Sequence, residues 1–413
     1  MMKFTFREYE HKEIPYELTA KDKDYLFELQ KRYVQPFTFH SLSKGTYFKF
    51  YSFVGVLELE HARIVIVPKF NRTFLDVVEM MLFAEEMPIP IEHDTKTELA
   101  QHSLVELLVK IFVKEVENIL RIGVFKEYVT ESDNLNLLRG SIEVREHIKV
   151  NMFQQGKIYC VYDELETNVI ENQVIRTALE IARRFNVSKE LMKDVHRLLD
   201  EFTMIADVFP YEEWPNFQYT RLNQHYERGH KLAYYIWKQM YMNHMYEFHQ
   251  RTHFSFLLDM NELFEKFVGQ LFVKFLPRAY KVKEQAMFKK AIIRDGESYR
   301  VMKPDILIES SEQQTIVIDT KYKPYGKHRV SNADIYQLSF YGHFVADDVP
   351  FTAMIIYPRY AKEAASSEVI QLLPGTVHEG RLLVKPISIE QILRAYQQKD
   401  IGFLKEMAKD LLI

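Results

Sequence analysis

The stretch that decides the fold of the last third of the chain is KPDILIESSEQQTIVIDTKYK, residues 303–323. DILIE (305–309) and TIVID (315–319) are rich in aliphatic and β-branched residues, which favour strands, and the polar SEQQ (311–314) between them is typical of a turn. The two segments predict neighbouring strands, with Asp305 at the start of the first and Asp319 and Lys321 on the second.

These three residues predict a metal-dependent hydrolytic site. Asp319 and Lys321 are two positions apart and therefore point to one face of a sheet, where a neighbouring strand can bring Asp305. Two carboxylates supply the hard oxygen ligands that hold Mg²⁺, or Mn²⁺, against a phosphodiester. The lysine can orient or deprotonate the attacking water and stabilise negative charge. The alternative is a surface salt bridge between Asp319 and Lys321 on an edge strand.

Two flanking residues are further candidates for this site. Glu265, in ELFEKFV, can reach from a preceding helix as a third metal ligand, or it is a solvated carboxylate on the helix face. Gln337 and Tyr341 lie four apart on a helix after the second strand, so they share a face. Both Gln337 and Tyr341 are expected to steady the lysine or contact the DNA backbone, with packing at the edge of the core as the alternative.

The segments around residues 303–323 predict an α-β-β-β-α-β order. A helix is expected over 259–276, with Asp259 or Asn261 as its N-cap, and two strands over 285–294 and 298–310 are expected to join at the tight turn Asp295-Gly296. After the strand TIVIDTKYK, Ser331 and Asp334 predict a capping box for a helix over 333–344, and FTAMIIYP (351–358) predicts a last strand.

The rest of the chain predicts a β-rich N-terminal region followed by mainly helical segments. Residues 1 to about 70 predict a small sheet or barrel, mainly from the Val, Ile, Phe and Tyr content of residues 47–70. Helical periodicity follows over 73–82 and 98–122. The middle region predicts a short strand over 157–165, a helix over 168–202, an ordered loop over 207–217 and a helix from 226 to about 246.

Composition and net charge restrict the number of domains and the kind of nucleic-acid surface that the chain can have. With 413 residues, 47% of them hydrophobic, the chain is expected to fold into two or three globular domains. The net charge of −4 confines any nucleic-acid surface to a local patch. Basic residues do cluster in the last third, although a solvated sheet face explains the charge equally well. They are Lys281, Lys283, Lys289, Lys290, Arg294, Arg300, Lys303, Lys321, Lys323, Lys327 and Arg329.

Other chemistries and compartments fit less well. The single cysteine, Cys160, excludes an internal disulfide and is expected to be a small core residue, and His249 and His253 are expected to be ordinary helix histidines. No P-loop motif and no HExxH motif is present. The start has no apolar signal segment and no stretch is long enough to span a bilayer, so we expect a cytoplasmic protein without a membrane partner.

Four stretches in order carry a resemblance to a known family. LLRGSIEVREHI (137–148), CVYDELETNVIENQVIRTAL (160–179), MNELFEKFV (260–268) and the KPDILIE and IVIDTKYK strands together resemble McrC, the nuclease subunit of McrBC-type modification-dependent restriction systems. VGVLELEHARIVIVPKF (54–70) looks like the N-terminal domain of that family. The first 45 residues show no match.

The resemblance implies partners and site residues. It implies a PD-(D/E)xK nuclease with Asp305, Asp319 and Lys321 in the catalytic roles, acting on double-stranded DNA. It also implies a McrB-like AAA+ GTPase hexamer that recognises methylated DNA, to which the N-terminal part docks and whose GTP hydrolysis it stimulates. A second set of residues, in the middle region, matches the family in pattern and either touches that partner or holds its own domain together. It comprises Arg139, Gly140, Asp163, Glu164 and Asn172.

The expected fold is therefore α+β and multidomain. A β-rich N-terminal domain with helices (residues 1–125) is expected to dock the partner. It is followed by a mainly helical middle region (126–250) and a C-terminal α/β PD-(D/E)xK nuclease domain with a mixed central sheet (251–413). The leading hypothesis is a Mg²⁺-dependent endonuclease subunit. The alternatives are a free-standing repair or recombination nuclease and a mainly regulatory subunit that binds the partner.

Overall fold

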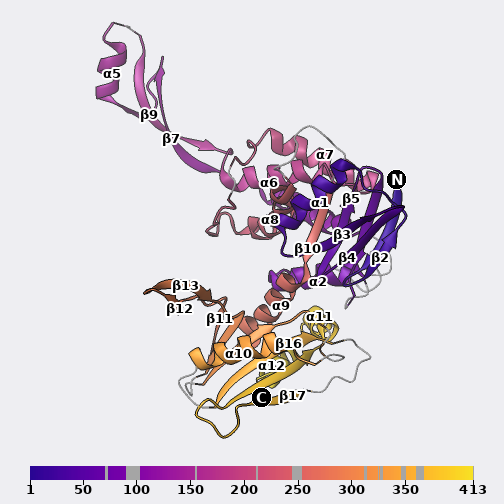
Figure 1. Ribbon diagram of the computed structural model, residues 1–413. Helices are drawn as coiled ribbons and strands as arrows, with labels where there is room; N and C mark the ends of the chain where they lie inside the picture. The colour runs from indigo at the N-terminus through magenta and orange to yellow at the C-terminus, as the bar shows by residue number, and fades with distance from the viewer. Residues whose placement is uncertain are drawn as a thin grey trace. The chain divides into compact units, whose positions relative to one another are not determined.

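The structure is a computed structural model of the chain. It describes residues 1–69, 73–89, 103–153, 156–210, 213–243, 254–310, 314–323, 325, 329–345, 350–359 and 367–412. The chain divides into two compact units, one formed by Met1–Leu107 together with Tyr246–Ile413, the other by Leu108–Met245 (Figure 1). The predicted site therefore lies in a unit that combines the two ends of the chain.

Two sheets form the N-terminal part of the first unit. A four-stranded sheet has the order β1-β6-β5-β10 and a three-stranded sheet the order β2-β4-β3, so the β-rich prediction for this region is confirmed. Their strands are β1 (Met2–Arg7), β2 (His11–Ile14), β3 (Phe37–Leu42), β4 (Gly45–Phe50), β5 (Phe53–Glu58), β6 (Ala62–Val67) and β10 (Phe254–Asp259). Their shared core is aromatic, with Phe6 and Phe50 packed edge to face at 4.7 Å between ring centroids.

One helix in this region was not predicted. Helix α1 (Ala20–Arg32) begins after Thr19, whose side chain accepts a hydrogen bond from the backbone of Asp22, and the Asp22 carboxylate accepts one in return from the backbone of Thr19. Its sequence is dominated by charged residues, but Leu26 and Leu29 are buried against the sheets. The capping box and the burial of two leucines therefore stabilise this helix, although its sequence shows little amphipathic periodicity.

Strand β10 connects the N-terminal sheet to the C-terminal half of the chain. It pairs antiparallel with β5, from Phe254 opposite Glu58 to Asp259 opposite Phe53. The close approach depends on Gly55, because a Cβ at that position would lie 1.8 Å from the backbone oxygen of Phe256. Helix α9 (Met260–Phe275) starts directly after β10, with Asp259 as its N-cap, as predicted.

A six-stranded mixed sheet forms the C-terminal part of the unit, in the order β11-β14-β15-β16-β18-β17. The β15–β16 and β16–β18 pairs are parallel and the other pairs antiparallel, so the prediction of a mixed sheet is confirmed. Helix α10 (Asn332–Val345) packs on β15, β16 and β18. The strands are β11 (Tyr280–Glu284), β14 (Ile306–Ser310), β15 (Thr315–Thr320), β16 (Phe351–Pro358), β17 (Glu368–Leu372) and β18 (Gly380–Ile387).

Further helices pack around α9. Helix α2 (Phe74–Ala84) lies against α9 and against α11 (Ile389–Gln397), while α12 (Ile401–Asp410) packs on α9 and α11. Phe83 of α2 contacts Phe267 of α9 and Tyr396 of α11, with centroid distances of 4.7 and 4.9 Å. These helices bury α9 along one side, which fixes the helix that carries Glu265.

A separate two-stranded sheet stands next to the six-stranded one. Strands β12 (Phe288–Arg294) and β13 (Glu297–Met302) form an antiparallel hairpin. Asp295 and Gly296 have positive φ angles of 53° and 86°, which is the backbone of a type I′ turn, so the predicted tight turn is confirmed.

The second unit combines helices with a small sheet. Helix α6 (Ile170–Ala182) packs against α7 (Lys189–Thr203) and α8 (Glu227–Asn243). The sheet has the order β7-β9-β8, and α5 packs on β9. Its elements are β7 (Glu127–Leu135), β8 (Ser141–Ile142), α5 (Val144–Asn151) and β9 (Ile158–Glu166); α4 (Leu104–Ile122) begins in the first unit, and η2 (Gln224–Tyr226) precedes α8.

Several residues singled out in the middle region hold this unit together. Asn172 donates hydrogen bonds to the carbonyls of Phe125 and Thr167 and accepts one from the hydroxyl of Tyr226. A Cβ on Gly140 would lie 2.3 Å from the carbonyl oxygen of Val161. Arg139 pairs with Glu164 at 3.1 Å, and Asp163 accepts a hydrogen bond from Thr130. Asn172 and Gly140 thus have a structural role, whereas the contacts of Arg139, Glu164 and Asp163 are exposed, and contact with a partner stays a prediction.

The structure corrects three expected elements. The helix expected over 168–202 is two helices, α6 and α7, because the chain turns between them at residues 183–188. The strand expected over 298–310 is split into β13 and β14 at Lys303-Pro304-Asp305, where proline cannot donate a ladder hydrogen bond. The middle region is less helical than expected, because β7 is a nine-residue strand. Its polar sequence, EYVTESDNL, lacks strand periodicity, and pairing with β9 holds it extended.

Some predictions lie outside the described residues. They include the N-terminal end of the helix expected over 98–122, His249, His253, Lys327 and the domain boundary at residue 250. The domain boundaries remain predictions. No helix in the described ranges is long and apolar enough to cross a membrane.

Candidate active site

Asp305 and Asp319 meet at neighbouring strand ends. Ile306 of β14 lies opposite Ile318 of β15, which places Asp305 and Asp319 at adjoining positions of the antiparallel pair. Asp305 Oδ2 accepts hydrogen bonds from the backbone N–H of Thr320 at 2.7 Å and from its hydroxyl at 2.9 Å. Thr320 therefore orients the first aspartate. Its role was missed because threonine within a buried strand gives no distinct sequence signal.

Lys321 bridges two carboxylates. Its Nζ lies 2.6 Å from Asp319 Oδ2 and 3.5 Å from Asp334 Oδ1. The Asp319 side chain is 3% exposed and that of Lys321 18% exposed, so the pair is not the exposed edge-strand salt bridge considered as the alternative. The backbone N–H of Lys321 donates to the carbonyl of Ile356 in β16, which fixes the residue just beyond the end of β15.

The charges of the site perturb one another. Burial, and then the negative charge of Asp305, raises the pKa of Asp319 although Lys321 opposes the shift. Burial alone would lower the pKa of Lys321, but Asp319 and Asp334 outweigh it and raise that pKa. Lys321 is therefore held protonated, while the buried Asp319 is repelled by the half-buried Asp305.

Asp334, expected only as a capping residue, belongs to this cluster. The Ser331 hydroxyl accepts from the Asp334 backbone N–H at 3.2 Å and donates to its carboxylate at 2.5 Å, and Tyr325 also donates to that carboxylate. Although burial acts to raise it, these hydrogen bonds and the charges of Lys321 and Lys323 lower the pKa of Asp334. Its carboxylate stays ionised and holds Lys321 from the side of α10.

Glu265 approaches the site from α9. Burial, and then the charge of Asp305, raises the pKa of Glu265. Gln285 donates its side-chain amide to Glu265 Oε1 at 2.6 Å and its backbone N–H to the carbonyl of Asp305 at 2.8 Å. Glu265 therefore shares the electrostatic environment of Asp305, and Gln285, which was not predicted, links the two.

Gln337 occupies a different position. Within the described part of α10, the Gln337 amide donates to the hydroxyl of Tyr341 at 3.2 Å, and Asp334 is the residue that reaches Lys321. Tyr341 in turn packs against the core of the C-terminal sheet. The pairing of Gln337 with Tyr341 on one face is confirmed, and the predicted support of the lysine is provided by Asp334 in this structure.

The donor chemistry of the site fits a divalent cation. Asp305 and Asp319 present carboxylates whose mutual repulsion a cation would relieve, and Mg²⁺ is commonly bound by one or two carboxylates together with substrate phosphates. No set of three or more His, Cys, Asp or Glu side chains in the described ranges is arranged to hold a metal ion. The two aspartates are therefore the residues that fit this role best, and Glu265, whose Oε1 accepts a hydrogen bond from Gln285, stays a predicted further ligand.

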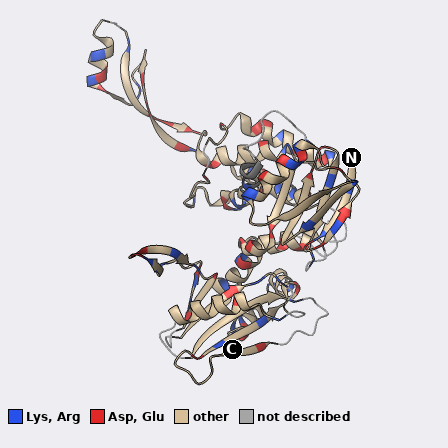
Figure 2. Cartoon of the chain, viewed as in Figure 1, with Lys and Arg blue, Asp and Glu red and all other residues tan. Residues whose placement is uncertain are grey.

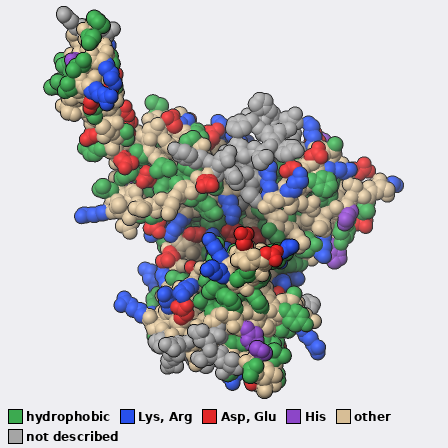
Figure 3. All heavy atoms as spheres, turned by 60° about the vertical axis from the view of Figure 1, so that its left-hand side comes forward, with side chains coloured by type: hydrophobic (Ala, Val, Ile, Leu, Met, Phe, Trp, Pro, Cys, Tyr) green, Lys and Arg blue, Asp and Glu red, His purple; other side chains and the backbone are tan. Residues whose placement is uncertain are grey.

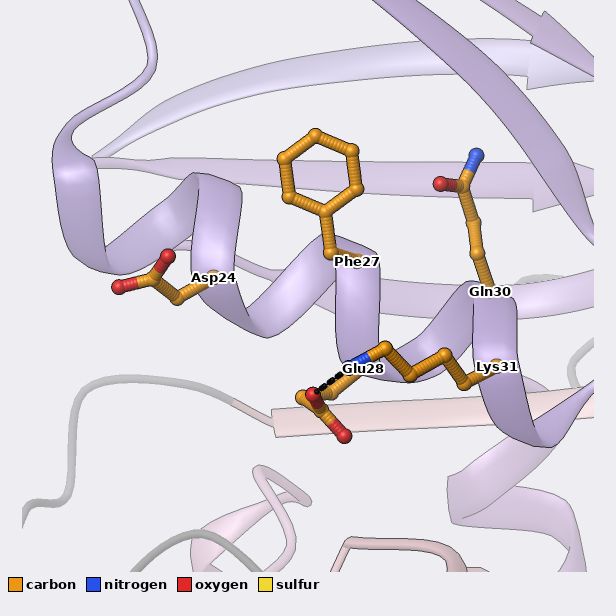
Figure 4. Close-up of a pocket in the computed structure, with 5 residues that line it drawn as sticks. All are labelled: Asp24, Phe27, Glu28, Gln30 and Lys31. Carbon is orange, nitrogen blue, oxygen red and sulfur yellow. Dashed lines mark hydrogen bonds and ion pairs between the residues drawn. The ribbon is translucent and has the colours of Figure 1, made fainter.

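A surface hollow on α1 lies elsewhere in the N-terminal part. It is lined by Asp24, Phe27, Glu28, Gln30 and Lys31, and an ion pair of 2.6 Å joins Lys31 to Glu28 (Figure 4). All five residues come from successive turns of one helix. None belongs to the acidic cluster, by which we mean Asp305, Asp319 and Asp334 around Lys321, so the hollow offers no competing site.

Comparison with known proteins identifies the family. The model of the family described as McrBC 5-methylcytosine restriction system component matches residues 48–358. No curated protein gives a significant sequence match.

A solved structure shows a similar fold. The chain is similar to McrC in a Thermococcus gammatolerans tetradecameric assembly of McrB AAA+ hexamers with bound McrC, with a TM-score of 0.63 and 17% identity over 97% of this chain and 100% of that one. A chain of the Thermococcus gammatolerans McrBC complex matches at a TM-score of 0.49 and 21% identity, covering 66% of this chain and 88% of that one. Because the family match spans three quarters of the sequence, the chain belongs to the McrBC 5-methylcytosine restriction system component family.

Proposed function

We propose that this chain is the Mg²⁺-dependent endonuclease subunit of a McrBC-type restriction system and cleaves double-stranded DNA when assembled with a McrB-like AAA+ GTPase hexamer, whose GTPase it stimulates. The observation that carries the proposal is the convergence of Asp305, Asp319 and Lys321 at the adjoining ends of β14 and β15. This is the arrangement that the PD-(D/E)xK assignment requires.

In this proposal each residue has a chemical task. Asp305 and Asp319 would hold the cation, with Thr320 keeping the Asp305 carboxylate in place. The chemistry that Mg²⁺ or Mn²⁺ supplies when bound is neutralisation of negative charge on the scissile phosphate. Lys321 donates hydrogen bonds to the attacking water or to a phosphate oxygen. Its raised pKa favours charge stabilisation over the role of general base.

An exposed part of the second unit is suited to contact the partner. The extension formed by β7, β8, β9 and α5 reaches away from α6, α7 and α8 of the same unit, and hydrophobic side chains gather at its tip (Figures 1 and 3). Leu137 is 80% and Phe153 93% exposed, and Leu138, Val144, Ile148 and Met152 are also exposed. Exposed apolar clusters of this kind mark protein contacts.

The similar Thermococcus gammatolerans McrC is bound to McrB hexamers, which supports a ring-forming partner here. The extension is therefore proposed as a docking element in addition to the N-terminal region, residues 1–125, that the resemblance implied.

The test separates cleavage from assembly. Wild type and Asp319→Asn are incubated with methylated duplex DNA, Mg²⁺, GTP and the McrB-like partner, and both cleavage and GTP hydrolysis are measured. We expect Asp319→Asn to lose cleavage and keep GTPase stimulation. Asp410→Asn, an exposed position on α12, is the matched control and should retain both.

The other outcomes identify the alternatives. Cleavage by wild type without partner or GTP would favour a free-standing nuclease. Cleavage by the Asp319→Asn variant at the wild-type rate would contradict the proposed active site. Stimulation of the partner without any cleavage by wild type would favour a regulatory subunit.

A further inference from the structure

The β12–β13 hairpin is attached at both ends to the candidate active site. On the entering side, Gln285 bonds to the carbonyl of Asp305 and to Glu265. On the leaving side, only Lys303 and Pro304 separate β13 from Asp305. The base is anchored further by Met302, which is 1% exposed, and by Phe288, whose ring lies 5.5 Å from that of Phe344 on α10. The hairpin therefore has a fixed root beside the acidic cluster.

Beyond its root the hairpin is exposed and basic. Figure 2 marks Lys and Arg positions along its ribbon in blue. Residues 288–303 contain two acidic residues, Asp295 and Glu297, both at the turn. They contain five exposed basic residues, Lys289, Lys290, Arg294, Arg300 and Lys303. In a chain with a net charge of −4, such a local excess of positive charge needs an explanation.

The arginines are placed for a ligand outside the chain. Arg294 and Arg300 flank the ring of Tyr299, with guanidinium-to-centroid distances of 5.5 and 5.8 Å. Tyr299 is itself 52% exposed. Within the described part of the chain, no carboxylate lies within ion-pair distance of Arg300, Lys289 or Lys290, and Arg294 meets only the exposed Asp295 at 3.6 Å. These cations therefore do not serve to hold the fold together.

A purely structural explanation fits these features poorly. Ile293 and Val301, 56% and 48% exposed, add apolar surface beside the charged residues of the hairpin. A two-stranded β-ribbon has the width of the DNA major groove, and guanidinium groups bind phosphates in a bidentate manner. Strands of this length extend roughly 20 Å, which matches several base pairs of duplex.

We infer that the β12–β13 hairpin binds double-stranded DNA next to the scissile phosphate, with Arg294 and Arg300 on backbone phosphates and Tyr299 between them. This inference rests on the proposed nuclease function and adds the element that aligns the substrate. Because the root of the hairpin carries Asp305 and contacts Glu265, DNA bound along it is directed toward the acidic cluster.

Equilibrium binding tests the inference without requiring cleavage. The full-length Asp319→Asn chain, with Ca²⁺ in place of Mg²⁺, is titrated into a fluorescently labelled DNA duplex at several salt concentrations. Adding Arg294→Gln and Arg300→Gln should raise the dissociation constant about tenfold or more and reduce the slope of log affinity against log salt by about two. The control pair Lys405→Gln and Lys409→Gln, exposed on α12, removes the same charge and should leave binding nearly unchanged.

Two further variants sharpen the result. Tyr299→Leu should weaken binding with little change of the salt slope, because it removes no charge. Arg300→Glu alone, at an exposed position, should weaken binding more than Arg300→Gln, and circular dichroism checks that each variant is folded. Equal affinities and salt slopes for the hairpin and control pairs would overturn the inference. A loss of affinity seen with a labelled single strand but not with the duplex would overturn it as well. Failure of Asp319→Asn to abolish cleavage would instead count against the proposed function alone.

Discussion

The hydroxyl of Tyr9 donates a hydrogen bond of 2.8 Å to the backbone carbonyl of Tyr322, 313 positions further along the chain. Tyr322 follows Lys321 directly, its side chain is 1% exposed, and its own hydroxyl donates to Glu8 at 3.3 Å. The segment that carries the candidate catalytic lysine is thus held by β16 through Lys321, and by Glu8 and Tyr9 in the turn after strand β1 through Tyr322. The N-terminal sheets are part of the scaffold of the site.

Tyr9→Phe should weaken this support without unfolding the protein. Loss of one partly buried hydrogen bond is expected to lower the free energy of unfolding by about 1 kcal/mol. Because the bond holds the residue next to Lys321, the cleavage rate should fall several-fold while binding of the GTPase partner is unchanged. Thermal unfolding and cleavage assays measure the two effects. Tyr47→Phe, whose hydroxyl makes no hydrogen bond with a described residue, is the control and should change neither. An unchanged cleavage rate for Tyr9→Phe would show that this hydrogen bond contributes to stability but not to catalysis.

Glu8 predicts a pH dependence of stability. Its burial raises the pKa of the carboxyl to about 8, with an added contribution from the charge of Asp259, although the Lys69 amide and the Tyr322 hydroxyl oppose the shift. Between the ordinary value of 4.5 and about 8, the folded chain keeps a proton that the unfolded chain has released. Stability therefore falls as pH rises through this range, by up to about 1.4 kcal/mol per pH unit from this group.

Glu8→Gln removes that dependence, because the side chain is neutral at every pH. Its melting temperature should fall less than that of wild type as the pH is raised from mildly acidic to mildly alkaline, as measured by calorimetry. The exposed Glu17→Gln serves as the control and should follow wild type. Parallel curves for Glu8→Gln and wild type would show that Glu8 is ionised in the folded protein.

Asp334→Asn tests the second carboxylate on Lys321. The amide keeps the volume and can still bond with Ser331, but it removes the charge that lies 3.5 Å from Lys321 Nζ. We expect cleavage to fall roughly 10- to 100-fold, the range typical for residues that position a functional group. GTPase stimulation should persist. Lys323→Gln removes a different partner of Asp334, 3.6 Å away, and is expected to have a much smaller effect. Equal losses in the two variants would contradict a specific role for the pair of Asp334 and Lys321.

Gly55→Ala should separate β10 from β5. The added Cβ would lie 1.8 Å from the carbonyl oxygen of Phe256, and the φ of 135° disfavours any side chain. Destabilisation by about 3 kcal/mol or more is expected, because neither backbone can give way without breaking the sheet. Gly123→Ala has a similar φ of 121° with nothing within 4 Å, so it measures the cost of the backbone angle alone. Thermal unfolding of both variants isolates the steric part, and equal melting temperatures would show that the sheet can adjust.

Local sequence patterns were sufficient to predict much of the candidate active site. Asp319 and Lys321 are two positions apart at the end of β15, and only four residues separate β14 from β15 in the sequence, so their meeting with Asp305 follows from strand geometry. The Asp295-Gly296 turn and the bond between Ser331 and Asp334 were predicted for the same reason, because each involves residues only a few positions apart. Strands with little periodicity of their own, such as β7, were not predicted from the sequence.

Through these spacings, the sequence alone predicted the neighbouring strands that carry Asp305 and Asp319 and the mixed sheet around them. The resemblance of several longer stretches, confirmed by the family match, identified the McrBC family. Only the tertiary structure decided that β10 completes the N-terminal sheet, that Gln285 joins Glu265 to Asp305, and that Tyr9 supports Tyr322. The physical reason is that periodicity records which face of an element is buried, but not which distant element covers it. Contacts across hundreds of residues depend on how the whole chain packs.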